Sequence, residues 1–519
     1  MAQQTIAPSR LEVLHQLGER TFDLVIVGGG INGCGIARDA AMRGLSVALL
    51  ERNDFGSGTS GRSSRMIHGG VRYLEHGHFR LVAEASRERR ILLRIAPHLV
   101  RPMEFVWPLF AGDRVPRWKL LAGLGLYDAF SVFRNTRPHE RLSAAGVLAR
   151  EPAIRGDGLS GGAVYSDAVT DDARLTLANA LAARNAGALI LNHAEVVGDG
   201  SFASPLLVHD LLSGDGVRVS ARAIVVAIGP WDQSVRGTKG SHVLVPRSRT
   251  GQEHAITFLS AEDQRVLFMV PDQDMTLIGT TDLPTAESPE TVTASVPEVD
   301  YLLRSASAVL ACEPLRTRDI VAAWAAIRPL AAQPATGEPA SLSREHSIQR
   351  RNGTIAVTGG KLTTYRAIAA EVVDRVVKQL RMSLPTAPTD RVPLPGVDRQ
   401  ARVVQAVSEN PELSGRITPE STHRKAELIV AARDEAAQTL GDLLIRRTRV
   451  AFRLQDRGVS LAPAVAELVG PVLGWDKARR DIEVERYAAE AAAMFGNRAA
   501  RAARPRAVSA SRLPHRVSS

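Results

Sequence analysis

One stretch near the start of the chain decides its fold: Phe22-Asp23-Leu24-Val25-Ile26-Val27-Gly28-Gly29-Gly30-Ile31-Asn32-Gly33. Residues 22–27 form a mostly apolar run, typical of a buried strand, that leads directly into a glycine-rich turn. The small residues of 31–42 favour a helix, Gly44 provides a stop for it, and residues 45–50 predict a second buried strand. Strand, helix and strand together indicate a βαβ unit.

The glycines Gly28, Gly30 and Gly33 have the spacing of a dinucleotide-binding turn. The first glycine makes the tight bend, the second lets the backbone approach a pyrophosphate, and the third lets the helix pack on the strand. The helix that begins near Ile31 points its positive end at the phosphates. Glu51 ends the second strand eighteen residues after Gly33, where a carboxylate accepts both hydroxyls of an adenosine ribose. The spacing predicts dinucleotide binding and leaves the dinucleotide open.

Length and composition limit the class of protein. A chain of 519 residues is too long for one core, so we expect two or three domains. Its 45% hydrophobic and 23% charged residues are typical of a globular protein. The two cysteines, Cys34 and Cys312, exclude a disulfide framework, a cysteine-rich zinc site and a four-thiolate iron–sulfur cluster. We therefore predict no metal site and a reducing, cytoplasmic setting.

The distribution of apolar and charged residues bears on membranes and partners. The first 20 residues have no signal-peptide core, and no stretch reaches the roughly 18 apolar residues of a spanning helix. Any membrane contact is therefore expected to be peripheral. The net charge is +10, and residues 498–519 contain six arginines and no acid. We interpret this basic tail as a solvated end that is open to anionic lipid, and not as a nucleic-acid reader.

Strand-then-glycine stretches at 222–230 and 354–360 indicate that the cofactor domain is assembled from separated pieces of chain. Between them, alternating apolar and polar residues at 243–340 predict a more antiparallel second domain that covers the cofactor. The prolines of 384–397 predict a semi-rigid linker. Residues 399–495 are rich in Ala, Leu, Glu and Arg at helical spacing and predict a helical domain.

Several further motifs make the chain similar to the FAD-dependent, quinone-linked (aerobic-type) glycerol-3-phosphate dehydrogenase family. The motifs are Gly-Gly-Gly-Ile-Asn-Gly at 28–33, Gly-Thr-Ser-Gly-Arg-Ser-Ser-Arg-Met-Ile-His-Gly-Gly-Val-Arg-Tyr-Leu-Glu at 58–75, Asp-Asp-Ala-Arg-Leu at 171–175, Lys-Gly-Ser-His at 239–242, Gly-Thr-Thr-Asp at 279–282, Ile-Arg-Pro-Leu at 327–330 and Gly-Gly-Lys-Leu-Thr-Thr-Tyr-Arg at 359–366. They cover most of residues 20–380 in order. The helical region resembles the family more loosely, through 442–449, and Ile228 and Cys34 depart from its pattern.

The resemblance implies an α/β fold with a discontinuous Rossmann-like FAD-binding domain, a substrate domain of mixed and antiparallel sheet, and an α-helical C-terminal domain. The expected divisions are an N-terminal segment at 1–20, FAD-binding parts at 21–110, 161–242 and 344–383, a substrate or membrane-proximal segment at 111–160, a substrate-binding cap at 243–343, a linker at 384–398, the helical domain at 399–496 and the basic tail at 497–519.

The resemblance also implies a reaction. It is the oxidation of sn-glycerol 3-phosphate to dihydroxyacetone phosphate by hydride transfer from C2 to FAD, in glycerol catabolism, with reoxidation by a membrane quinone. The implied partners are glycerol 3-phosphate, ubiquinone or menaquinone, the inner surface of the cell membrane and a second copy of the chain, with no nucleic acid. A candidate membrane contact is the segment 115–134, where Trp118 and Phe130 lie among flanking basic residues, although an ordinary buried helix has the same composition.

Other functions remain open at this stage. The nearest is a glycerol-3-phosphate oxidase that passes electrons to oxygen, and a more distant one is another FAD-dependent oxidase of the amino-acid oxidase-like fold. A non-catalytic flavin-binding module or a basic RNA-associated protein is a third, supported mainly by the tail.

The matched motifs name candidate cofactor contacts. They are Gly28, Gly30, Ile31, Asn32, Gly33, Glu51, Arg52, Thr59, Ser60, Ser64, Gly229, Gly360, Lys361, Leu362 and Thr363. The pair Gly359-Gly360 is interpreted as a second glycine turn that opens a helix, whose N–H groups face the pyrimidine end of the flavin.

The substrate contacts follow from the same motifs. The resemblance implies that Arg72, Arg344 and Lys361 bind the phosphate with Tyr73 beside them, since guanidinium and ammonium groups suit a phosphate. Arg328 is expected to face the reacting hydroxyls, where its permanent charge stabilises a developing alkoxide. A histidine is the better proton acceptor, because imidazole titrates near neutral pH. His68 and His242 both lie in matched motifs, and the sequence does not choose between them.

Overall fold

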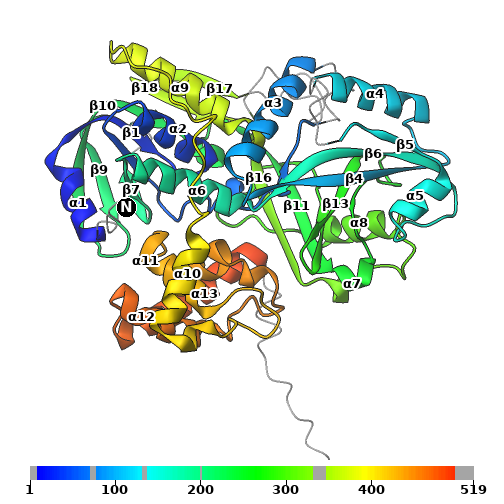
Figure 1. Ribbon diagram of the computed structural model, residues 1–519. Coiled ribbons are helices and arrows are strands. Elements are labelled where there is room, and N and C mark those ends of the chain that lie inside the picture. The colour runs from blue at the N-terminus through cyan, green and yellow to red at the C-terminus, as the bar shows by residue number, and fades with distance from the viewer. Residues whose placement is uncertain (1–8, 71–77, 131–136, 199–201, 331–345, 497–519) are drawn as a thin grey trace, which may run out of the picture.

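The computed structural model describes residues 9–70, 78–130, 137–198, 202–330 and 346–496. Figure 1 shows a first sheet with its helices on the left of the molecule, a second sheet on the right, and a helical part below the first sheet and the junction between the two. The predicted α/β class, with a Rossmann-like cofactor domain, a mixed sheet and a helical C-terminal domain, is confirmed.

The first sheet carries the predicted βαβ unit. Its parallel strands lie in the order β18 (Thr354–Thr358), β10 (Gly216–Val226), β1 (Thr21–Val27), β2 (Val47–Leu50) and β7 (Leu189–Leu191). Such strands are buried on both faces, which explains why β1 and β2 are almost wholly apolar. Antiparallel additions extend the sheet, and they are β17 (Ser347–Arg351), β8 (Ala194–Val197) and β9 (Leu206–Asp210).

Helices cover both faces of this sheet. On one face, α2 (Ile31–Met42), α6 (Asp172–Asn185) and α9 (Tyr365–Gln379) pack into a shared core with β1 and β2. On the other face, α1 (Arg10–Glu19) packs its Val13 and Leu17 against the same strands. The N-terminal end of α2 therefore opens at the carboxyl edge of the parallel strands, where ligands bind in folds of this kind.

The second sheet is largely antiparallel, as the alternating sequence predicted. Its strands are, in spatial order, β15 (Leu283–Thr285), β11 (Arg236–Pro246), β14 (Met275–Gly279), β13 (Val266–Asp272), β12 (Ala255–Leu259), β4 (Val100–Phe110), β6 (Leu159–Thr170) and β3 (Met66–Ile67), with β16 (Ala322–Leu330) beside β11 and β5 (Glu140–Leu142) beside β6. The pair β12 and β4 is parallel. Its helices are α3 (Phe79–Ile95), α4 (Arg117–Phe130), α5 (Ala144–Arg150), α7 (Arg247–Thr250) and α8 (Val296–Ser307).

The chain crosses between the two sheets at points that differ from the expected divisions. Strands β3 and β4 belong to the second sheet, although residues 21–110 were assigned to the FAD-binding domain. Strands β6 and β11 also belong to the second sheet, although most of β6 and the first half of β11 fall in the expected FAD-binding part at 161–242. The reason is physical: the residues of a strand predict that it is extended, but not which distant strand it pairs with.

The C-terminal part is helical, as predicted. It consists of α10 (Arg399–Glu409), α11 (Lys425–Asp434), α12 (Ala462–Leu473) and α13 (Lys477–Phe495), with short turns η7 (Pro411–Ser414), η8 (Asp442–Arg447) and η9 (Val450–Phe452). The proline-rich residues before α10 form neither helix nor strand. Phe452 packs against Trp324 of β16, with ring centroids 4.9 Å apart. Within the described ranges, no helix is both long enough and apolar enough to cross a membrane.

Short single-turn helices join the larger elements around the cavity described below. They are η1 (Thr59–Gly61), η3 (Gly229–Trp231), η4 (Thr317–Asp319) and η6 (Leu362–Thr364). Three of them, η1, η3 and η6, contribute residues to the wall of that cavity.

Candidate active site

A cavity of about 370 Å³ lies where the carboxyl edge of the first sheet meets β11 and β16 of the second sheet. This volume is within the range of small-molecule and cofactor sites. Its wall contains the first glycine turn, the loop after β2, the second glycine turn and the inner face of β16. Sequence-predicted residues in the wall are Gly28, Gly30, Ile31, Asn32, Glu51, Arg52, Thr59, Ser60, Ser64, His68, Gly229, His242, Arg328, Gly360, Lys361, Leu362 and Thr363.

The first glycine turn has no room for side chains. Gly28 has a φ of +109°, and a Cβ there would lie 2.6 Å from the carbonyl oxygen of Ala227. A Cβ on Gly33 would overlap the carbonyl oxygen of Gly28. Gly33 does not line the cavity, but its lack of a side chain lets α2 pack closely on β1. The start of α2 faces the cavity.

Glu51, at the end of β2, is held by the backbone around it. Its carboxylate accepts hydrogen bonds from the N–H groups of Gly29 (2.5 Å) and Asn53 (2.8 Å). Burial raises the pKa of Glu51, against the effect of these two hydrogen bonds. The next residue, Arg52, is half-exposed and pairs with Glu195 at 3.1 Å. Glu51 thus occupies the position predicted for a ribose-binding carboxylate.

The loop after β2 connects the two sheets across the cavity. The hydroxyl of Thr59 donates to the carbonyl of Ile327 in β16, at 2.6 Å. Oγ of Ser60 accepts from the N–H of Ile31 at the start of α2, at 3.0 Å. Oγ of Ser64 lies 2.9 Å from Nε2 of His242 in β11. These hydroxyl groups therefore fix the distance between the first glycine turn and the second sheet.

The second glycine turn, Gly359-Gly360, joins β18 to η6, and both glycines have positive φ, +74° and +85°. The side-chain amide of Asn32 donates to the carbonyl of Gly359 at 3.2 Å, which ties the two glycine turns together. Oγ1 of Thr363 accepts from the N–H of His68 at 3.2 Å. The start of η6 is thereby placed in the cavity wall, which Leu362 and Thr363 line.

His242 lies in β11 of the second sheet and lines the cavity. Its ring stacks on Trp324 of β16, with centroids 5.4 Å apart and planes 16° from parallel. Burial, reinforced by the positive charges of Arg328 and Arg65, lowers the pKa of His242 to about 3. Among the described residues, nothing bonds its Nδ1 atom. The imidazole is therefore neutral at physiological pH.

Acceptors from Thr280, Thr281 and Asp282 hold Arg328 of β16 in place. Its Nη1 donates to the carboxylate of Asp282 (3.0 Å) and to the carbonyl of Thr281 (3.1 Å), and its Nη2 donates to Oγ1 of Thr280 (2.8 Å). The guanidinium lies directly over Gly240 of β11, where any side chain would overlap it. Sequence reasoning missed the role of Asp282 and Thr280. The signal was present in the Gly-Thr-Thr-Asp motif, but only the pairing of β11 with β14 and β16 brings that motif to Arg328.

His68, the second candidate base, follows β3 and meets the ring of Phe268 edge to face, with centroids 6.3 Å apart. It lines the main cavity and also a smaller one of about 90 Å³. Arg328 and Ser64 line both cavities as well. The structure thus brings both histidines and Arg328 to one region of the site.

Of the residues predicted to bind the phosphate, one lies in the described part of the chain. Arg72, Tyr73 and Arg344 lie outside the described residues, and Lys361 is the predicted phosphate contact that lies in the cavity wall.

The shape and chemistry of the cavity fit FAD. Gly28 and Gly30 line the cavity without adding a side chain to it, which leaves space for a pyrophosphate beside the start of α2. Glu51, after β2 of the first sheet, is an acceptor suited to ribose hydroxyls, whereas Arg328 and His242 belong to strands of the second sheet. These groups match a dinucleotide with its reactive ring toward the second sheet.

Two family models match the chain. Residues 23–375 match the FAD dependent oxidoreductase family, and residues 389–480 match the C-terminal domain of alpha-glycerophosphate oxidase. The fold and the site therefore define an FAD-dependent oxidoreductase, and FAD is its cofactor.

Individual relatives narrow this class. A glycerol-3-phosphate dehydrogenase of Synechocystis is 34% identical over 91% of this chain and 96% of its own length. Glycerol-3-phosphate dehydrogenase 2 of Mycobacterium tuberculosis is 36% identical over 91% of this chain and 88% of its own. The X-ray structure of the Bacillus halodurans glycerol-3-phosphate dehydrogenase complexed with FAD is similar with a TM-score of 0.76 and 26% identity, over 94% of this chain and 98% of that one. The chain belongs to the glycerol-3-phosphate dehydrogenase family, which confirms the resemblance of its motifs.

Proposed function

We propose that this protein oxidises sn-glycerol 3-phosphate to dihydroxyacetone phosphate in the cavity between the two sheets. The observation that carries the proposal is the position of Arg328 and His242, which lie in one wall with the two glycine turns of the FAD site. A permanent cation beside neutral imidazole suits an alcohol whose oxygen gains negative charge as its carbon loses hydride. The names of the relatives support the same substrate.

FAD, when bound, supplies the hydride acceptor for C2 of the substrate. Arg328 stays charged at any working pH and donates hydrogen bonds toward the oxygen on C2, while its ion pair with Asp282 fixes the direction of the guanidinium. His242 or His68 accepts the hydroxyl proton. Burial keeps the ring of His242 neutral, and a doubly negative phosphate in the site makes the protonated ring less costly, which raises its pKa toward the working pH.

Phosphate binding is proposed for Lys361 together with Arg72, Arg344 and Tyr73. Lys361 directly precedes η6 and lies in the cavity wall, where its ammonium can bind a phosphate. The other three residues are proposed from the family resemblance of their motifs alone.

For reoxidation we propose a membrane quinone, reached from the inner face of the cell membrane as part of glycerol catabolism. The helix α4 supports a peripheral contact. Its Leu120 and Leu124 are buried against the protein, whereas Trp118 and Leu126 are 72% and 39% exposed. A surface tryptophan near basic residues is typical of helices that lie on a membrane.

Reoxidation by oxygen is a second candidate, because the C-terminal domain matches a model named after alpha-glycerophosphate oxidase. One experiment addresses substrate and acceptor together. Anaerobic addition of glycerol 3-phosphate to the purified yellow protein is expected to bleach the flavin absorbance. Reoxidation is then followed with a quinone analogue and, separately, with air while peroxide is measured. A flavin that stays oxidised with glycerol 3-phosphate would refute the proposed substrate, and fast peroxide formation in air would favour the oxidase.

A further inference from the structure

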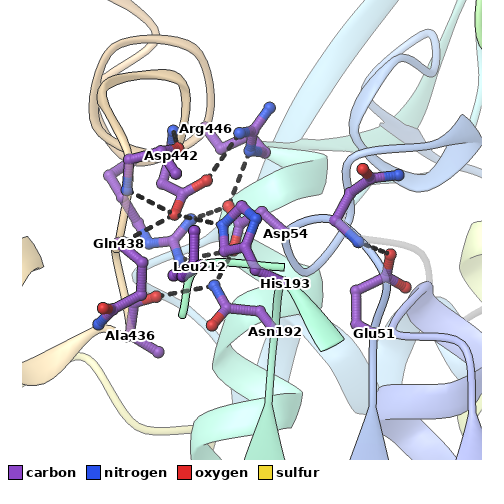
Figure 2. A network of polar contacts seen from close by, with 12 residues as sticks. Glu51, Asp54, Asn192, His193, Leu212, Ala436, Gln438, Asp442 and Arg446 are labelled. Carbon is purple, nitrogen blue, oxygen red and sulfur yellow. Dashed lines mark hydrogen bonds and ion pairs between the residues drawn. The ribbon is translucent and has the colours of Figure 1, made fainter. Parts of the chain in front are cut away.

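The C-terminal helical domain makes a buried ionic contact with the loop that forms one side of the FAD cavity. We call residues 51–64 the cofactor loop and residues 442–449 the arginine segment. Asp54 of the cofactor loop is fully buried. Its carboxylate accepts from Nε of Arg446 at 2.7 Å and from Nη1 and Nη2 of Arg447 at 2.5 and 2.9 Å. Figure 2 shows Asp54 between Arg446 and the residues around His193.

Asp54 does not itself line the cavity, but its neighbours on both sides do. Glu51, Arg52 and Asn53 precede it in the wall, and Gly56 to Ser60 follow it. Its carbonyl accepts from the N–H of Ser57 at 3.0 Å, and the N–H of Gly56 donates to the carbonyl of Gly29 at 3.0 Å. The position of Asp54 therefore sets the path of the loop between the ribose carboxylate and the first glycine turn.

The arginine segment also holds the far end of the cofactor loop. Nη1 of Arg449 donates to the carbonyl of Gly61 at 2.9 Å. The same guanidinium pairs with Asp172, whose other carboxylate oxygen accepts from the N–H and hydroxyl of Ser63 at 2.8 and 2.7 Å. The loop is thus anchored at two places by one short piece of the C-terminal domain.

A third set of contacts joins the cofactor loop to Asn192 and His193, the two residues that precede β8. Nε2 of His193 lies 3.0 Å from the carboxylate of Asp442 at the start of the arginine segment, as Figure 2 shows. The backbone N–H of His193 donates to the carbonyl of Asn53 at 2.6 Å. Asn192 donates from its side chain to Asp54 at 3.0 Å and to the carbonyl of Ala436 at 2.9 Å.

We propose that Arg446, Arg447 and Arg449 are positioning residues for FAD, which act through Asp54 and Gly61 to hold the cofactor loop in its binding shape. A buried carboxylate needs its charge partners, so the loop cannot leave its position without breaking several charged hydrogen bonds. A loop that is already ordered binds its ligand without further loss of conformational freedom. The C-terminal domain thereby contributes to flavin retention without touching the flavin. This inference rests on the bound cofactor and is independent of the proposed substrate.

A matched pair of variants tests the proposal. Arg447→Gln removes one of the two arginines on Asp54. Arg174→Gln removes one of the two arginines on Glu435, a buried pair of the same kind between α6 and the C-terminal domain, with contacts of 2.6 and 2.8 Å. In each variant the buried carboxylate keeps one arginine partner. Only the first pair includes a residue of the cofactor loop.

The measurement is the rate of flavin release from full-length holoenzyme, followed by the rise in flavin fluorescence on dilution. Arg447→Gln is expected to release flavin about ten-fold faster than wild type, which corresponds to ~1.4 kcal/mol. Arg174→Gln is expected to release flavin at nearly the wild-type rate, although its denaturation midpoint is expected to be similar to that of Arg447→Gln. Hydrogen exchange of residues 51–64 in the holoenzyme is expected to speed up in the first variant only.

If Arg447→Gln does not fold, Arg447→Lys keeps the charge, loses the two-pronged contact and is expected to show the same changes to a smaller degree. Equal acceleration of flavin release in the Arg447 and Arg174 variants would show a general effect of stability and overturn the proposal. Unchanged release and exchange in a folded Arg447 variant would overturn it as well. None of these readouts requires glycerol 3-phosphate, so a failure here is distinct from a failure of the proposed reaction.

Discussion

The carboxylate of Asp282 lies 3.0 Å from Nη1 of Arg328, and the two residues come from opposite sides of β11. Asp282 joins β14 to β15 on one side, and Arg328 is in β16 on the other. The pair is fixed at the place where the two cavities meet, since Arg328 lines both of them. An arginine held in this way keeps its guanidinium charge in a set position, which is what stabilisation of a transition-state charge requires.

Replacement of Arg328 tests its role in the reaction. Arg328→Gln is expected to lower the rate of flavin reduction by glycerol 3-phosphate about 100-fold, because one charged donor to the developing alkoxide is lost. Asp282→Asn should lower the rate less, since it weakens only the orientation of the guanidinium. Anaerobic stopped-flow absorbance gives the rates, with Arg318→Gln, an exposed arginine of η4, as the control. A wild-type rate of flavin reduction in the Arg328 variant would show that Arg328 takes no part in the reaction.

The low pKa of His242 predicts a pH dependence of stability. The folded protein leaves His242 neutral down to about pH 3, whereas an ordinary histidine in the unfolded chain takes up a proton below about pH 6.5. Between these values the unfolded state binds more protons, so the free energy of unfolding falls as the pH falls, by about 1.4 kcal/mol per pH unit for one group. In His242→Gln this contribution is expected to vanish.

Denaturant unfolding of both proteins at several pH values between 6.5 and 4.5 provides the comparison. The wild-type free energy of unfolding should decline more steeply toward acid than that of the variant, so that the two curves approach each other. Parallel curves would mean that His242 is not held neutral by its surroundings.

Two glycines provide a test of close packing in the cofactor site. Gly33→Ala is expected to cost about 2 kcal/mol or more of stability and to lose bound flavin, because the new methyl group overlaps the carbonyl of Gly28 and pushes α2 from β1. Gly123→Ala, in the middle of α4, adds a Cβ that meets none of the described residues within 4 Å, and it is expected to stabilise the protein by up to about 1 kcal/mol. Thermal unfolding and flavin content report both effects. Normal flavin content in the Gly33 variant would contradict the tight β1–α2 contact.

Membrane contact through α4 is tested by liposome flotation. The double variant Trp118→Ser/Leu126→Ser removes two exposed apolar side chains of this helix and is expected to reduce the floating fraction several-fold. Ile482→Ser removes a 55% exposed apolar side chain from α13 and should leave flotation unchanged. Equal flotation of all three proteins would exclude α4 as the anchor.

The local features of the cofactor site were predictable from sequence. The glycine turn at 28–33, the helix after it and the carboxylate of Glu51 all follow from spacing, and the structure places each of them in or directly behind the cavity wall. The helical C-terminal domain and the antiparallel character of the second sheet also follow from periodicity. In each case the signal lies within a few turns or strands of continuous chain.

The points where the chain crosses between the sheets were not predictable in the same way. The prediction placed β4 and most of β6 in the FAD-binding domain, whereas both strands lie in the second sheet. Likewise, the matched motif at 442–449 was evidence only for family membership, and nothing in its sequence indicates that Arg446 and Arg447 bind Asp54, almost 400 positions earlier. Pairing over such distances depends on packing of the whole chain.

The sequence by itself determined the cofactor class, the βαβ unit that receives it and the motifs that define the family, because those properties depend on residue types at short spacing. Only the tertiary structure decided which residues meet: Arg328 with Asp282, His242 with Ser64 and Trp324, and the C-terminal arginines with the cofactor loop. The physical reason is that a buried charge or ring is positioned by its partners, and these partners come from strands and helices that are distant in the chain.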